Sequence, residues 1–140
     1  MRASLAREAN SLLFFRKKMP KKILFIEDET DLVLMVRTRL EANGFKMVSA
    51  GDGEAGLKMA DEEKPDLILL DLQIPKIHGF EVCKRLKQDP KTRGVPVMIF
   101  TVSAGPNLED RCRAVGAEAC LRKPFEASHL LATMKELLRG

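Results

Sequence analysis

The 140-residue sequence predicts an α/β fold, a doubly wound parallel sheet in which five strands alternate with five helices. Short apolar runs of strand length alternate along the chain with segments whose apolar residues recur at helical spacing. The strand runs are almost continuously apolar, which is typical of parallel strands covered by helices on both faces.

The elements follow one another from residue 23 onward. Residues 23–26 form an apolar run that predicts a buried first strand. Residues 31–43 carry Leu32, Met35, Val36, Arg39 and Leu40 at helical spacing, and Asn43-Gly44 is a stop signal for that helix. The same alternation predicts further strands over 45–50, 66–70, 95–100 and 119–121 and further helices over 53–63, 80–88, 108–115 and 126–138.

Bulk properties limit the class of protein. The length suits one domain, and 45% hydrophobic with 31% charged residues is ordinary for a globular protein. Cys83, Cys112 and Cys120 form an odd set without metal-finger spacing, so reduced thiols are expected rather than disulfides.

The net charge of +4 is unevenly distributed. Residues 1–22 hold seven basic residues and one acid, a net of +6, which leaves −2 for residues 23–140. We therefore expect a flexible basic extension over 1–20 and one domain over 21–140, with no direct nucleic-acid role. The apolar run at residues 12–15 is too short for a signal peptide or a membrane span, so a cytoplasmic protein is expected.

Polar residues follow four of the strands. Glu27 and Asp28 follow the first strand, Asp71 the third, Thr101 the fourth and Lys123 the fifth. In doubly wound folds ligands bind at the carboxyl ends of the strands, so these side chains are expected to converge.

The chemistry of this group is that of phosphoryl transfer. Two carboxylates ~5 Å apart repel by about 3 kcal/mol at an effective dielectric of 20, and a divalent cation and a lysine relieve this repulsion. Mg²⁺ suits two carboxylates and a backbone carbonyl. Asp71 would be the covalent nucleophile, while Thr101 and Lys123 would stabilise the phosphoryl oxygens.

Five stretches in register carry a family resemblance. They are KILFIEDE at 22–29, LLDLQIP at 69–75, GFEV at 79–82, Phe100-Thr101 and KPF at 123–125. They closely resemble the receiver domain of bacterial two-component response regulators. The intervals of 30 residues from Asp71 to Thr101 and 22 from Thr101 to Lys123 match the family's usual spacing.

The resemblance implies a flavodoxin-like fold with strand order 2-1-3-4-5. It implies a switch, not a classical enzyme, that receives a phosphoryl group on Asp71 from a histidine kinase or histidine phosphotransfer protein. Mg²⁺ or Mn²⁺ would be held by Asp28, Asp71 and the backbone carbonyl of Gln73, and by Glu27 through water. With the chain ending at the last helix, signalling by docking to a downstream protein effector is expected.

Some positions depart from the family pattern or tune it. Cys120 stands where the family often has Tyr or Phe, so no aromatic ring can change rotamer there. Val102 stands where a small residue is usual, and its methyl groups would narrow access to the phosphoryl site. Gln73 and Ser103 occupy positions that tune hydrolysis in the family.

Other interpretations are weaker. Residues 51–56 fit G-x-G-x-x-G, but they follow the second strand and contain two acids, so a tight turn is favoured over a dinucleotide site. A phosphatase of the haloacid-dehalogenase type needs an acid at position 73, where Gln73 cannot serve. A receiver-like module that is never phosphorylated is the remaining alternative. His78 and His129 are expected to be structural or on the surface, and Met35, Met47, Met59 and Met98 to fill the core.

Overall fold

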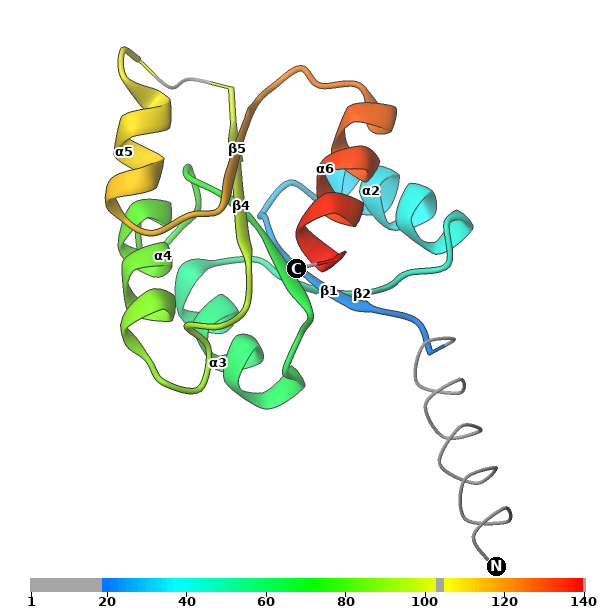
Figure 1. The fold of residues 1–140 in the computed structure, drawn as a ribbon, viewed down its shortest axis with the longest axis horizontal. Helices are drawn as coiled ribbons and strands as arrows, with labels where there is room; N and C mark the ends of the chain where they lie inside the picture. The colour runs from blue at the N-terminus through cyan, green and yellow to red at the C-terminus, as the bar shows by residue number, and fades with distance from the viewer. Residues whose placement is uncertain (1–18, 103–104, 140) are drawn as a thin grey trace, which may run out of the picture.

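The computed structural model describes residues 19–102 and 105–139 and contains one five-stranded parallel sheet in the order β2-β1-β3-β4-β5 (Figure 1). The strands are β1 (Lys22–Ile26), β2 (Lys46–Ala50), β3 (Leu67–Asp71), β4 (Val97–Thr101) and β5 (Ala119–Arg122). The helices are α2 (Thr30–Ala42), α3 (Gly53–Glu63), α4 (Gly79–Gln88), α5 (Leu108–Ala114) and α6 (Ala127–Arg139). The predicted fold class and strand order are confirmed.

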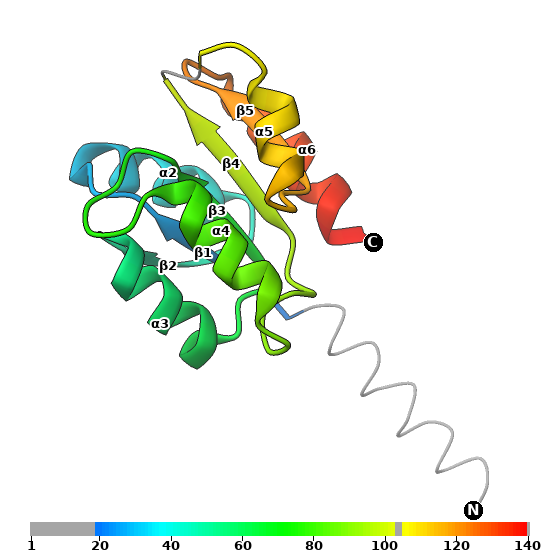
Figure 2. The same ribbon diagram turned by 90° about the vertical axis from the view of Figure 1, so that its left-hand side faces the viewer.

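Helices cover both faces of the sheet. Figures 1 and 2 show α2 and α6 on one face and α3, α4 and α5 on the other. Successive side chains of a strand point to opposite faces, so Ile23 and Phe25 pack with α2 and α6, while Leu24 and Ile26 pack with α3, α4 and α5. Burial on both faces explains why the central strands are continuously apolar.

The predicted boundaries differ from the observed ones where local chemistry intervenes. β4 begins at Val97 instead of residue 95, because Pro96 lacks an N–H and the Val95 N–H donates to the Thr92 carbonyl in the preceding turn. α4 begins at Gly79 instead of residue 80, because Nδ1 of His78 caps the helix by accepting from the Phe80 N–H at 3.1 Å.

The prediction that Met35 fills the core is wrong, since its side chain is 54% exposed. The buried residues of α2 are Val36 and Leu40, and Met35, one residue before Val36, lies outside this buried side of the helix. Of the other three methionines predicted to fill the core, Met59 is half-buried and Met47 and Met98 are buried.

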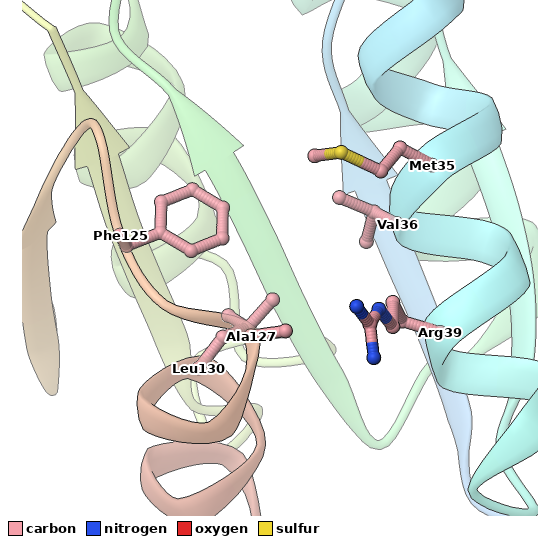
Figure 3. A pocket seen from close by; sticks show the side chains of 6 residues that line it. All are labelled: Met35, Val36, Arg39, Phe125, Ala127 and Leu130. Carbon is pink, nitrogen blue, oxygen red and sulfur yellow. The ribbon is translucent and has the colours of Figure 1, made fainter.

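Met35 instead lines a surface pocket of about 220 Å³ between α2 and the start of α6 (Figure 3). The pocket is formed by Met35, Val36, Arg39, Phe125, Ala127 and Leu130.

The glycines of the segment at residues 51–56, after β2, allow close packing as well as a turn. A Cβ on Gly56 would lie 2.6 Å from Cδ1 of Ile26, and one on Gly53 would lie 2.8 Å from Ile77. The absence of these side chains lets α3 approach β1 and the loop before α4. Asp52 caps α3 by accepting from the Ala55 N–H at 2.8 Å.

The predicted basic extension lies almost wholly outside the described residues, which begin at Met19. Within residues 19–102 and 105–139, no helix combines the length and apolarity needed to cross a bilayer.

Candidate functional site

The strand register brings the predicted site residues to one edge of the sheet. Ile26 of β1 is level with Leu70 of β3, and Asp71 is level with Phe100 of β4. Because parallel strands in register end together, the residues that follow them share the carboxyl edge. Glu27 extends this register by one residue, since its N–H donates to the Ala50 carbonyl at 2.9 Å.

Asp71, the last residue of β3, is only 5% exposed. Its Oδ1 accepts a hydrogen bond from the Gln73 N–H at 3.2 Å. Its Oδ2 lies 3.5 Å from Nζ of Lys123. One oxygen is therefore oriented by the backbone and the other faces a cation.

Lys123 connects two carboxylates from distant parts of the chain. Its Nζ donates to Oε1 of Glu27 at 3.0 Å as well as contacting Asp71, and its side chain is 12% exposed. The ammonium also lies 4.7 Å from the centre of the Phe100 ring, a cation–π contact. The backbone N–H of Lys123 donates to the Thr101 carbonyl at 2.8 Å, which fixes the start of the β5–α6 loop next to β4.

Glu27 is buried, with 3% of its surface exposed. Its Oε2 accepts from the N–H groups of Asp28 at 3.0 Å and Glu29 at 3.4 Å. Burial raises the pKa of Glu27 to about 7, and the neighbouring Asp71 carboxylate raises it as well, against the opposing effect of Lys123. The carboxyl group of Glu27, with its pKa of about 7, therefore changes between its protonated and ionised forms near neutral pH.

The acidic residues fit a small hard cation. Glu27, Asp28 and Asp71 each offer one carboxylate oxygen, and these oxygens lie within 4.8 Å of one another. Two oxygens bound to the same Mg²⁺ at ~2.1 Å are at most about 4.2 Å apart, so Asp28 and Asp71 would need only a small side-chain adjustment to share one ion, with Glu27 reaching it through water. Asp28 is exposed while the other two are buried, which leaves the group open to solvent on one side.

Gly79 holds the loop that follows Asp71. Its N–H donates to the Leu72 carbonyl at 3.0 Å. A Cβ at this position would lie 2.5 Å from the Leu72 Cα and 2.6 Å from the Asp71 carbonyl oxygen, both backbone atoms. The loop can close against the end of β3 only because residue 79 has no side chain.

The remaining predicted site residues differ in burial and in position relative to the acidic group, which consists of Glu27, Asp28 and Asp71. Thr101 ends β4 and is fully buried, whereas Val102 is 61% exposed and Gln73 is exposed. Cys120 lies within β5, where it contacts Cys112 rather than the acidic group. Ser103 lies outside the described residues.

Two contacts were missed by reasoning from the sequence. To predict the contact of Lys123 with the Phe100 ring, one would need the register of β4 and β5. To predict the Cys112–Cys120 contact, one would need to know how α5 packs on β5. The Gly79 close approach had a signal in the sequence, because a glycine opening a helix suggests tight packing.

A family model for the response regulator receiver domain matches residues 23–135. The chain belongs to the response regulator receiver domain family. The match covers β1 from its second residue and the other four strands completely, and it includes Glu27, Asp28, Asp71, Thr101 and Lys123.

Curated relatives of this receiver domain include proteins of different lengths. It is 37% identical over 120 residues to the polar-differentiation response regulator DivK of Brucella anthropi, covering 86% of this chain and 98% of that protein. It is 38% identical over 121 residues to the alkaline phosphatase synthesis transcriptional regulatory protein PhoP of Bacillus subtilis, covering 86% of this chain but 50% of PhoP.

Solved receiver structures share its architecture. A response regulator from Chloroflexus aurantiacus superposes with a TM-score of 0.82 at 28% identity, covering 86% of this chain and 99% of that one. The chemotaxis response regulator CheY4 of Vibrio cholerae superposes with a TM-score of 0.78 at 29% identity, covering 84% and 98%. The fold, strand order and family are thus those of a CheY-like receiver domain.

Proposed function

We propose that this receiver domain is a single-domain response regulator that accepts a phosphoryl group on Asp71 from a histidine kinase or histidine phosphotransfer protein, with Mg²⁺ or Mn²⁺ required. The observation that carries the proposal is the contact of Lys123 with both Glu27 and Asp71, beside the exposed carboxylate of Asp28. An anionic group arriving at Asp71 would meet an ammonium already positioned in the site.

The acceptor step forms one bond and breaks one. A carboxylate oxygen of Asp71 attacks phosphorus, an O–P bond forms, and the N–P bond of the donor's phosphohistidine breaks with its electron pair left on the imidazole nitrogen. The contact of Oδ1 with the Gln73 N–H orients the carboxylate. Lys123 would exchange its contact with Asp71 for one with a phosphoryl oxygen.

The cation would be held by Asp28, Asp71 and the Gln73 carbonyl, with Glu27 acting through water. When bound, it would neutralise charge on the phosphoryl oxygens. Thr101 would supply a hydroxyl to the phosphoryl group, and Val102, beside it, would limit access to the acyl phosphate. The same group of side chains would assist hydrolysis, so the protein acts as a switch and turns over no external substrate.

The relatives differ in length and in the role that their names give. DivK, which this chain covers almost completely, is a response regulator of comparable length, whereas PhoP is a transcriptional regulatory protein about twice as long. By analogy with DivK, we propose a cytoplasmic protein that signals by docking to a downstream protein effector and does not bind nucleic acid itself.

The test is phosphotransfer from purified histidine kinases of the source organism. Wild type is expected to become labelled by at least one kinase in the presence of Mg²⁺, and Asp71→Asn to remain unlabelled. Asp61→Asn is the matched control, because Asp61 is an exposed residue of α3 that pairs with the exposed Lys91. Equal labelling of wild type and Asp71→Asn would place the acceptor elsewhere, and absence of labelling by every kinase would favour the unphosphorylated interaction module.

A further inference from the structure

Two of the three cysteines lie in contact on the face of the sheet covered by α5. Sγ of Cys112, on α5, is 3.0 Å from Sγ of Cys120, on β5. Cys112 is 2% exposed, and Cys120 is half-buried against the same apolar cluster. All three cysteines are free thiols in this structure.

The backbone already holds these two thiols together. The Ala117 N–H donates to the Cys112 carbonyl at 3.1 Å, so the chain turns back immediately after α5. β5 is fixed in the sheet by its pairing with β4, where Cys120 is level with Ile99. A disulfide needs a sulfur separation of about 2.05 Å, so the two side chains need to move by only about 1 Å in total.

A small oxidant has a route to the pair. A surface cavity of about 170 Å³ is lined by both cysteines together with Glu109, Arg113 and Glu118. Cys83 differs, since it is fully buried and its thiol donates to the Val115 carbonyl at 3.5 Å.

We propose that Cys112 and Cys120 form a reversible intramolecular disulfide that ties α5 to β5 when the protein meets a hydroperoxide. A thiolate of Cys120 attacks a peroxide oxygen, the O–O bond breaks, and a sulfenic acid and hydroxide form. The Cys112 sulfur then attacks the Cys120 sulfur, the S–OH bond breaks, and water leaves with the Cys112 proton. Two thiols thereby lose two electrons to the peroxide, and a dithiol restores them.

The order of attack follows from the surroundings of each thiol. Burial raises the pKa of Cys112 to about 12, and donation of its S–H to Cys120 raises it as well. Burial also raises the pKa of Cys120, while acceptance of that hydrogen bond lowers it; the charge of Glu109 raises this pKa and the charge of Arg122 lowers it. Cys120, the more exposed of the two, is therefore the sulfur that reacts first.

The bridge would restrict the part of the fold next to the acidic group. β5 runs directly into Lys123, and Arg122 is level with Thr101 in the sheet. In the oxidised protein, α5 cannot separate from β5. This inference does not rest on the proposed function, because Asp71→Asn is expected to form the same bridge.

The experiment treats the full chain with hydrogen peroxide or with buffer, blocks remaining thiols in denaturant, and maps tryptic peptides without reduction. We expect wild type to lose two of its three thiols and about 2 Da of mass, with the peptides carrying Cys112 and Cys120 joined. Dithiothreitol is expected to restore both thiols. Cys83→Ser is the matched control, because a serine hydroxyl can replace the buried thiol as a donor, and it should form the bridge as wild type does.

Several results would overturn the inference. These are three thiols that persist after oxidation, a bridge that includes Cys83, a bridge between two chains, or stable sulfinic acid on Cys120 with Cys112 unmodified. Cys120→Ser is expected to keep both remaining thiols. Because wild-type peptide mapping identifies the bridged sulfurs directly, the result does not depend on whether a Cys112 variant folds.

Discussion

Replacing Lys123 by methionine removes the ammonium that separates two buried carboxylates and keeps a side chain of similar length. Nζ of Lys123 lies 3.0 Å from Glu27 and 3.5 Å from Asp71, so each gross attraction is about 5 kcal/mol at an effective dielectric of 20. The cost of burying the ammonium offsets much of this attraction. Removal of one partner nevertheless leaves the carboxylates unpaired, and we expect a loss of about 3 kcal/mol of unfolding free energy at pH 8 without Mg²⁺.

The loss is expected to depend on pH through Glu27. Its pKa is already raised to about 7, by burial above all, and removing Lys123 takes away a cause that lowers it. A carboxyl whose pKa is higher when folded than when unfolded contributes stability at low pH that is lost as the pH rises through the folded pKa. Lys123→Met should therefore be destabilised less at pH 6, where the folded protein takes up a proton, than at pH 8.

Urea unfolding followed by far-ultraviolet circular dichroism measures this, since the chain has no Trp or Tyr for fluorescence. Adding Glu27→Gln to Lys123→Met should recover about 2 kcal/mol at pH 8, because it removes one of the two repelling charges. Lys91→Met, which removes only the exposed ion pair with Asp61, should change stability by less than about 0.5 kcal/mol. Equal destabilisation of Lys123→Met at pH 6 and pH 8, or no recovery in the double variant, would refute the electrostatic reasoning.

Three further outcomes are expected. Gly79→Ala should lower the unfolding free energy by about 2 kcal/mol, because its Cβ would lie 2.5 Å from the Leu72 Cα and 2.6 Å from the Asp71 carbonyl oxygen. Urea unfolding measures this change, and an unchanged free energy would show that the loop can move aside. Thr92→Val should cost about 1–2 kcal/mol in the same assay, since the buried hydroxyl donates to the Leu86 carbonyl at 2.7 Å, whereas Thr38→Val, at an exposed position, should cost less. Mg²⁺ affinity measured by calorimetry should be weaker at pH 6 than at pH 8 because protonated Glu27 no longer adds its charge, and a pH-independent affinity would contradict that role.

The alternation of apolar runs and helical spacing was sufficient to predict the layers and the edge that carries Glu27, Asp28 and Asp71, whereas the strand order was predicted from the family resemblance. The reason is physical: parallel strands covered on both faces have a distinctive pattern, and their carboxyl ends must share an edge. Asp71 and Thr101 could be assigned to that edge because each ends an uninterrupted apolar run.

Features that depend on side-chain direction could not be predicted in this way. Met35 fits a helical spacing, yet it precedes the buried Val36 by one residue and so lies on a different side of α2. Its side chain therefore lines the surface pocket between α2 and α6 instead of the core (Figure 3). The Cys112–Cys120 contact joins residues that a linear pattern treats as separate elements. Its distance is set by how α5 packs on β5, which no local signal specifies.

The measurement closest to the central claim is the site of covalent modification after incubation with a small acyl phosphate such as acetyl phosphate. With Mg²⁺ present, the intact mass of wild type should rise by about 80 Da, and borohydride reduction should convert residue 71 to homoserine. Asp71→Asn and wild type in excess EDTA should remain unmodified. Reduction at any other carboxylate, or an unchanged wild-type mass with Mg²⁺ present, would contradict the account.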